Sequence, residues 1–266
     1  MDKVRIREII EEIEKFSPLY WQETYDNSGL ILGDTQKDCL GAYICLDVSE
    51  DIIDEAMEKN CNLIISHHPI IFNNLKNIDY NSQLGKIIVK AIKNNITLYC
   101  CHTNMDNAFN GVNGILAEKI GLINFKPLTN DRIFKDENYL GGGALGELEK
   151  EISTKDFLIY LKEKLNLSYI KYNSNKVKQI KKVALCGGGG AFLIEKAIEQ
   201  KADIFISGEI KYHQLLDNEN AILLAEIGHF ESEHFIKERI VAILNKKFCN
   251  FVPLFLKEKE NRVKYL

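Results

Sequence analysis

Leu63-Ile64-Ile65-Ser66-His67-His68-Pro69 is an apolar run that ends in two adjacent histidines and a proline. A short β-branched run bounded by turn residues is typical of a strand that is covered on both faces. Pro69 lacks a backbone N–H and favours an extended conformation for His68, so the strand is expected to stop there. The two imidazoles therefore stand at the carboxyl end of a buried strand, where open α/β sheets hold their ligands.

Successive side chains of an extended segment point in opposite directions, which leaves two alternatives for His67 and His68. Either each imidazole binds a different metal ion, or both bind one ion across a bend in the chain. In both cases further ligands must come from elsewhere in the sequence.

Strand-like and helix-like runs alternate around this segment. Strands are expected at 42–47, 62–66 and 96–101, and helices at 4–16, 50–60 and 81–94. Apolar strands separated by helical runs of about a dozen residues indicate βαβ units in a mainly parallel sheet. The sequence therefore predicts an α/β fold.

The second half of the chain repeats the first at a constant offset of 141 residues, since 42 aligns with 183 and 63 with 204. The matched segments, with shared Cys and Ser at their ends, are Ala42–Cys45 with Val183–Cys186 and Leu63–Ser66 with Ile204–Ser207. We infer an internal duplication.

The turn-rich run 128–146 marks the junction of the two copies, which predicts repeats at 1–128 and 129–266. The C-terminal part is expected to pack back on the first repeat. Gly208 and Glu209 replace His67 and His68 in the second copy, so the copies differ where chemistry is expected.

Composition indicates a soluble globular protein. The 266 residues carry a net charge of −4, and scattered Lys and Arg disfavour a surface that tracks nucleic-acid phosphates. The local cluster at 176–182 is interpreted as a solvated face before a strand. The N-terminus has no apolar run suited to a signal peptide, so a cytoplasmic location is expected. Seven cysteines without a CxxC pair are expected to be mostly small buried hydrophobes.

Two further segments place a histidine four residues before an acid, directly after a predicted strand. His102 precedes Asp106, and His229 precedes Glu233. At the start of a helix, positions i and i+4 share one face, so each segment can offer an imidazole and a carboxylate to one point.

Together with His67 and His68, these segments supply up to four imidazoles and two carboxylates. A tetrahedral ion needs about four protein ligands or fewer, so the set is large enough for two ions that share a carboxylate. A nitrogen-rich mixed set favours Zn, Fe, Mn, Co or Ni over Mg or Ca. Cys100 and Cys101 are interpreted as core residues, and His213 and His234 as surface or supporting residues.

Two turn-forming segments have a structural and a functional interpretation. The polar residues 26–29 shape a turn or face a site, and the turn is favoured. Gly187–Gly190 lies between a strand and a helix, the setting of a phosphate-binding loop, but matches neither the P-loop nor the dinucleotide fingerprint. A tight turn is favoured there, with a backbone-donor site for substrate as the alternative.

Four motifs resemble those of the NGG-interacting-factor-three-like (YbgI-like) family, whose members are often labelled GTP cyclohydrolase type 2 homologues. They are Ser66-His67-His68-Pro69, His102-Thr103-Asn104-Met105-Asp106, Ser207-Gly208-Glu209-Ile210-Lys211-Tyr212-His213 and Gly228-His229-Phe230-Glu231-Ser232-Glu233. The resemblance implies a duplicated three-layer α/β/α fold, a dinuclear metal site between the two halves and a homohexameric ring. By matching, it implies metal ligands at His67, His68, Asp106, His229 and Glu233.

The resemblance and the ligand set favour a metal-dependent hydrolase that acts on a nucleotide or related small molecule and holds two divalent ions per chain. His102 and Glu209 are the candidates for proton transfer. The alternative is a non-enzymatic metal-binding regulatory or metal-delivery ring. An assembled ring is expected from the resemblance together with apolar residues near the C-terminus that need burial somewhere: Phe248, Phe251, Val252, Leu254 and Phe255.

Overall fold

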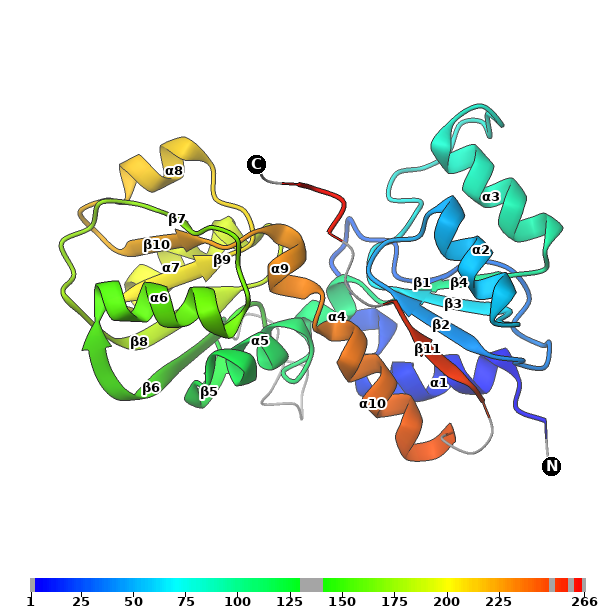
Figure 1. The fold of residues 1–266 in the computed structure, drawn as a ribbon, viewed down its shortest axis with the longest axis horizontal. Coiled ribbons are helices and arrows are strands. Elements are labelled where there is room, and N and C mark those ends of the chain that lie inside the picture. Colours follow the sequence, from blue (N-terminus) through cyan, green and yellow to red (C-terminus); the bar gives the residue numbers. More distant parts are fainter. Residues whose placement is uncertain (1–2, 130–140, 249–251, 258–260, 265–266) are drawn as a thin grey trace. The chain divides into compact units, whose positions relative to one another are not determined.

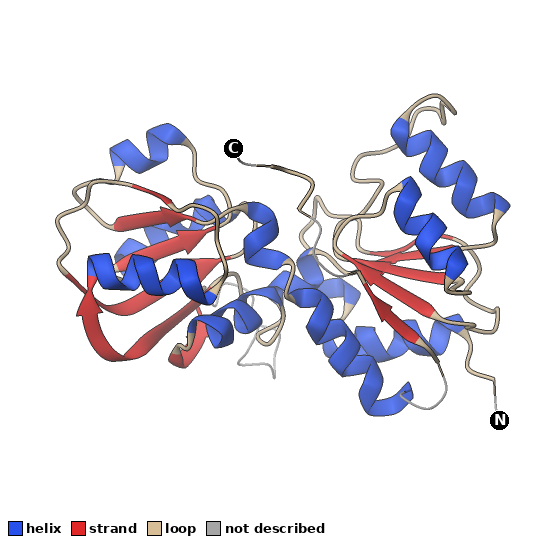
Figure 2. Ribbon diagram, in the orientation of Figure 1, coloured by secondary structure: helices blue, strands red, loops and turns tan. Residues whose placement is uncertain are grey.

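The computed structural model describes residues 3–129, 141–248, 252–257 and 261–264. The chain divides into two compact units, one of Met1–Met105 with Ile236–Glu260 and the other of Asp106–Phe235 with Asn261–Leu266. Each unit contains one β-sheet with helices on both of its faces (Figures 1 and 2). The structure thus confirms a mixed α/β fold.

The sheet of the first unit has the strand order β1-β4-β3-β2-β11. Its strands are β1 (Gly29–Leu32), β2 (Ala42–Cys45), β3 (Leu63–Ser66), β4 (Thr97–Cys100) and β11 (Leu254–Leu256). All run parallel except β1, which is antiparallel to β4. The apolar run at 63–66 is therefore the central strand, and all four residues of β3 are buried.

Two pairs of helices cover this sheet (Figure 1). They are α2 (Glu50–Glu58) with α3 (Gln83–Lys93), and α1 (Ile6–Phe16) with α10 (Ile236–Phe248). Tyr43 and Ile64 pack in one apolar cluster with residues of α2 and α3. Tyr99 instead donates its hydroxyl to Glu14 of α1, 3.1 Å away. Successive side chains of a strand face the two helical layers in turn, and both layers are apolar. The sequence of each strand is therefore a continuous apolar run.

The sheet of the second unit has the order β5-β6-β8-β9-β10-β7. Its strands are β5 (Ile123–Pro127), β6 (Ala144–Ser153), β7 (Lys171–Tyr172), β8 (Gln179–Cys186), β9 (Ile204–Ser207) and β10 (Leu223–Glu226). The core strands β8, β9 and β10 are parallel, and the others pair in the antiparallel sense. Helices α5 (Val112–Ile120) and α6 (Thr154–Lys164) pack in one apolar cluster, and α7 (Ile194–Glu199) and α8 (Tyr212–Asp217) in the other.

The strand register reproduces the sequence repeat. In the first unit Ala42 pairs with Leu63 and Cys45 with Ser66. In the second unit Val183 pairs with Ile204 and Cys186 with Ser207, which is the same register 141 residues later. Each copy therefore contributes one parallel βαβ unit to its own sheet.

The compact units do not coincide with the ranges 1–128 and 129–266 expected from the repeat. Helix α5 and strand β5 precede the expected junction, yet they pack on the second sheet. Helix α10 and strand β11 pack in the first unit. The predicted junction at 128–146 includes residues 130–140, which lie outside the described ranges.

The C-terminal apolar residues that the structure describes are covered within the first unit. Phe248 and Val252 are buried, and Leu254 and Phe255 are half-buried on β11, which pairs with β2. Phe251 lies outside the described residues. The first unit covers this segment itself, so the expected ring rests on the family resemblance alone.

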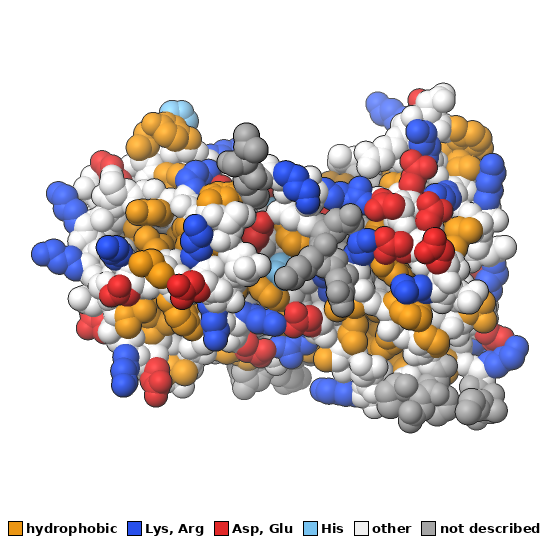
Figure 3. Space-filling model, viewed as in Figure 1, with side chains coloured by type: hydrophobic (Ala, Val, Ile, Leu, Met, Phe, Trp, Pro, Cys, Tyr) orange, Lys and Arg blue, Asp and Glu red, His pale blue; other side chains and the backbone are white. Residues whose placement is uncertain are grey.

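Charges of both signs are interspersed over the visible surface of each unit (Figure 3). Two lysines of the 176–182 cluster have structural partners. Lys181 donates to the carbonyls of Leu148 and Glu149 at 2.7 and 3.0 Å, and Lys182 donates to the carbonyl of Gln200. These contacts favour the structural interpretation of the cluster. Within the described ranges, no helix combines the length and apolar character needed to cross a membrane.

The six cysteines that the structure describes are free and buried. Because burial disfavours the thiolate, it raises the pKa of Cys39 to about 12 and that of Cys61 to about 11. Only about one Cys61 thiol in a thousand would then be ionised at pH 8. We expect iodoacetamide to leave all six unmodified in native protein and to modify them after unfolding, as read by peptide mass spectrometry. Labelling of any of the six before unfolding would contradict this expectation.

Candidate functional site

His67 and His68 form a corner at the end of β3. Their backbone N–H groups extend the strand pairing by donating to the carbonyls of Cys45 and Leu46. The Ser66 hydroxyl donates to the carbonyl of His68 at 2.8 Å and so closes the corner. The two rings lie with their centroids 5.0 Å apart. A bend therefore brings the two adjacent rings to one side of the chain.

His102, which follows β4, completes a group that we term the imidazole triad: His67, His68 and His102. Its ring centroid lies 5.3 Å from that of His67 and 5.6 Å from that of His68. One ring nitrogen from each of the three lies within 4.8 Å of the others. The carboxyl ends of β3 and β4, which are parallel neighbours, bring these residues together.

Each histidine of the triad has an oxygen partner at its Nδ1 atom. His67 Nδ1 lies 2.8 Å from the Cys101 carbonyl oxygen. His68 Nδ1 lies 2.8 Å from Asp47 Oδ1, and His102 Nδ1 lies 2.7 Å from Asp26 Oδ1. A partner of this kind keeps the proton on Nδ1 and leaves the Nε2 lone pair for a ligand. The donor set thus fits Zn²⁺ or another divalent transition-metal ion. Histidine ligands of such ions typically have an oxygen partner at the second ring nitrogen.

Asp26 is a site residue for which the sequence analysis favoured a turn role. Its side chain is fully buried, and its Oδ2 atom accepts hydrogen bonds from Ser28 Oγ and the Thr103 N–H at 2.8 and 2.9 Å. Burial opposes ionisation, but the hydrogen bonds from His102 and Thr103 hold the pKa of the carboxyl well below its usual range. The only sequence signal was the polar head of the 26–29 turn, so that segment both shapes a turn and faces the site.

Asp26→Asn is expected to lower the free energy of unfolding by about 2–3 kcal/mol, because it removes charge-assisted hydrogen bonds in a buried position. Urea denaturation of metal-free protein measures this loss. Asp34→Asn is the matched control, since Asp34 is exposed and its side chain accepts from the Gln36 N–H in an ordinary turn. An equal loss in both variants would contradict the prediction.

The second unit contains a further group, which we term the carboxylate set: Asp106, His229 and Glu233. Asp106 lies in α4 (Thr103–Asn107), and the other two begin and end α9 (His229–Glu233). His229 Nε2 is 3.0 Å from Glu233 Oε2, which confirms that this i, i+4 pair shares one face. A carboxylate oxygen of Asp106 lies within 4.8 Å of one of Glu233. Burial is the main cause that raises the pKa of the Cys186 thiol well above its usual range, and the nearby carboxylates of Asp106 and Glu233 raise it further.

Glu209 orients His229. Its Oε1 atom lies 2.9 Å from His229 Nδ1, and its side chain is 66% exposed. His229 therefore has a carboxylate at each ring nitrogen, one exposed and one, Glu233, only 4% exposed. This contact places Glu209 beside a candidate ligand, although its predicted part in proton transfer stays a prediction.

The glycine run 187–190 is a tight turn whose amides bind side chains of the second unit. Gly188 and Gly190 donate their N–H groups to the hydroxyls of Ser232 and Ser207 at 2.9 and 3.0 Å. Gly187 donates to Asn113 Oδ1 at 2.9 Å. These bonds favour the turn over the alternative of a backbone-donor site.

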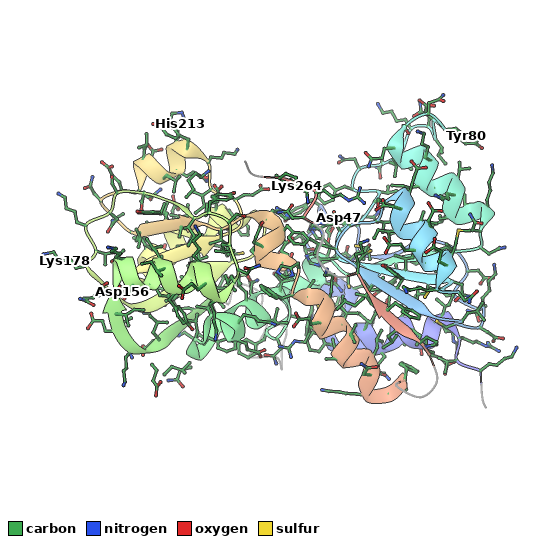
Figure 4. All side chains as sticks on the ribbon, in the orientation of Figure 1. Asp47, Tyr80, Asp156, Lys178, His213 and Lys264 are labelled. Atoms are coloured by element: carbon green, nitrogen blue, oxygen red, sulfur yellow. The ribbon has the colours of Figure 1, made fainter. Side chains whose placement is uncertain are left out.

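Gly188 also leaves room for Glu233. Its φ is +58°, and a Cβ atom at this position would lie 2.1 Å from Glu233 Oε1. The run that resembled a phosphate loop therefore supports the carboxylate set. The remaining histidines do not join either group: His213 is exposed on α8 (Figure 4), and His234 stacks on Phe230 with ring centroids 5.0 Å apart.

Comparisons with known proteins agree with the resemblance. A family model described as Duf34/NIF3 (NGG1p interacting factor 3) matches residues 4–261. The "GTP cyclohydrolase 1 type 2 homolog" of Clostridium acetobutylicum is 34% identical over 86% of this chain and 85% of its own length. The protein of the same name from Campylobacter jejuni is 36% identical over 88% and 90%. The crystal structure of a Bacillus cereus protein related to NIF3 covers 100% of both chains, with a TM-score of 0.92 at 24% identity.

Proposed function

Because the chain belongs to the Duf34/NIF3 family, we propose that it binds two divalent metal ions and hydrolyses a nucleotide or related small molecule. The observation that carries this proposal is the imidazole triad, in which each Nδ1 has an oxygen partner and one nitrogen per ring lies within 4.8 Å of the others. The names of the relatives from Clostridium acetobutylicum and Campylobacter jejuni support a nucleotide-like substrate.

The two groups differ in the metal ligands that they offer. The imidazole triad contributes only nitrogen ligands, whereas the carboxylate set contributes two carboxylates and one imidazole. We infer that His67, His68, Asp106, His229 and Glu233 would hold the two ions, with Glu233 as the ligand that both would share. A bound pair of divalent ions supplies an activated water nucleophile and neutralises charge on the substrate.

The surrounding residues orient these ligands and move protons. Asp47 and Asp26 hold the rings of His68 and His102, and Glu209 holds the ring of His229. Glu209 is exposed and can exchange a proton with water, while His102 is 17% exposed and paired with Asp26. We therefore assign proton transfer to Glu209 and His102.

A substrate panel tests the proposal. Protein reconstituted separately with Mn, Zn, Fe and Ni is assayed on nucleotides, phosphoesters and amides. We expect turnover of at least one of these classes of compound. A chelator should abolish this turnover and added metal should restore it, and His68→Ala should remove it. Reversible metal exchange without turnover of any compound would overturn the hydrolase assignment in favour of a metal-binding regulatory or delivery protein.

His102→Ala is expected to reduce metal content less than His67→Ala or His68→Ala. Although His102 belongs to the imidazole triad, the family resemblance implies ligand roles for His67 and His68 only, so we treat His102 as an outer partner. Loss of an outer partner typically weakens metal binding by about 10–100-fold, whereas loss of a ligand can empty a site. Elemental analysis after dialysis measures metal per chain in the three variants. Equal depletion in all three would make His102 a ligand.

A further inference from the structure

Two exposed aromatic side chains stand beside the imidazole triad in the first unit. Phe72 is 45% exposed and Tyr25 is 61% exposed. The Phe72 ring lies edge to face with that of His102, with centroids 6.1 Å apart and an interplanar angle of 76°. The Tyr25 ring lies 6.2 Å from that of Phe72 at 48°. We term Tyr25 and Phe72 the aromatic wall.

Hydrogen bonds tie the backbone beneath this wall to the triad. Asn27 Nδ2 donates to the carbonyl of Ile71, the residue before Phe72, at 2.7 Å. The His102 N–H donates to Ser28 Oγ at 3.1 Å, and Asp26 accepts from the His102 ring. These hydrogen bonds therefore link the turn that carries Tyr25 to the segment that carries Phe72 and to His102.

The position of the wall points to a ligand. Exposed aromatic rings lose the favourable burial that such side chains normally gain, and these two rings contact each other and, through Phe72, His102, so a bound ring would restore burial beside the triad. Aromatic rings stack readily on the π-faces of planar heterocycles. Because Phe72 contacts His102, a ring stacked on Phe72 would hold its substituents next to the triad.

We propose that Tyr25 and Phe72 form the stacking site for a planar nitrogen heteroaromatic ring, the base portion of the substrate. This inference rests on the proposed function, since it names the substrate class of the same site. A second copy of the chain is a poorer occupant. It would also cover His68 and His102, whose side chains are 20% and 17% exposed and need access for a substrate.

A matched pair of probes tests the wall. Guanosine 5′-monophosphate and ribose 5-phosphate differ only by the base, so phosphate and sugar contacts are common to both. Calorimetric titration measures their affinity for zinc-loaded and metal-free protein. We expect the base-containing probe to bind more tightly, and Phe72→Leu or Tyr25→Leu to weaken it about 10-fold without changing ribose 5-phosphate binding.

Tyr80→Leu is the control, because Tyr80 is 68% exposed in the segment before α3 (Figure 4) and should affect neither probe. Equal affinity of the two probes for wild-type protein, or equal weakening of both by Phe72→Leu, would overturn the wall. If Phe72→Leu changed the mass of the protein in light scattering and left the affinity for both probes unchanged, the aromatic wall would be a subunit contact. That result would also overturn the proposal. Failure to bind zinc contradicts the proposed function, while the metal-free titration still tests the wall.

Discussion

Gly188→Ala is expected to weaken metal binding by about 100-fold, the upper end of the range for disturbing the surroundings of a ligand. The added Cβ atom would lie 2.1 Å from Glu233 Oε1 and 3.4 Å from His229 Cε1, so the carboxylate must move. The φ of +58° adds a backbone cost of about 1–2 kcal/mol for any residue with a Cβ. We therefore expect a lower melting temperature as well as a loss of metal.

Gly189→Ala is the matched control. Gly189 has a φ of −80°, and among the described residues nothing beyond its chain neighbours lies within 4 Å of a Cβ built there. Metal content after dialysis and thermal melting with and without metal compare the two variants. In a Glu233→Ala background, Gly188→Ala should add only its backbone cost, because the clashing carboxylate is gone. Wild-type metal content in Gly188→Ala would refute the role given to this glycine.

Glu233→Gln is expected to weaken both metal ions together, whereas Asp106→Asn should weaken mainly one. A carboxylate has two oxygens that can bind different ions, whereas an imidazole presents one lone pair. Glu233 is the shared neighbour in the carboxylate set, since it lies beside His229 at 3.0 Å and within 4.8 Å of Asp106. Glutamine keeps the shape but replaces one acceptor oxygen by a donor NH₂ and removes the charge.

Elemental analysis after dialysis decides between the two acids. Glu199→Gln is the control for the substitution itself, because Glu199 is 65% exposed at the end of α7. If Glu233→Gln retains one tightly held ion per chain and Asp106→Asn loses both, the bridging role passes to Asp106.

Local patterns predicted the core strands and their repeat. The apolar runs at 42–47, 62–66 and 96–101 became β2, β3 and β4, because a short β-branched run needs only neighbouring strands and helices to be buried. The offset of 141 residues reappears as identical register in the two sheets. Such periodicities are properties of the backbone, and a sequence displays them directly.

Other elements depended on distant parts of the chain. The alternation did not predict β6 and α6, which follow the turn-rich segment and complete the second sheet. The division between the units was also displaced from the repeat boundary, because α5 packs on the second sheet while α10 and β11 pack in the first unit. Packing against residues far away in sequence, and not local propensity, fixes these placements.

The candidate site divides in the same way. The sequence by itself determined which candidate ligands stand at strand ends, since the His-His-Pro corner and the His229–Glu233 spacing are set by strand and helix geometry. Only the tertiary structure identified the partners of the imidazoles: Asp26 with His102 across 76 positions, Asp47 with His68 across 21, and Glu209 with His229 across 20. Gly188 likewise meets Glu233 only in the folded chain. The carboxyl ends of neighbouring strands carry these loops, and only sheet pairing brings such ends together.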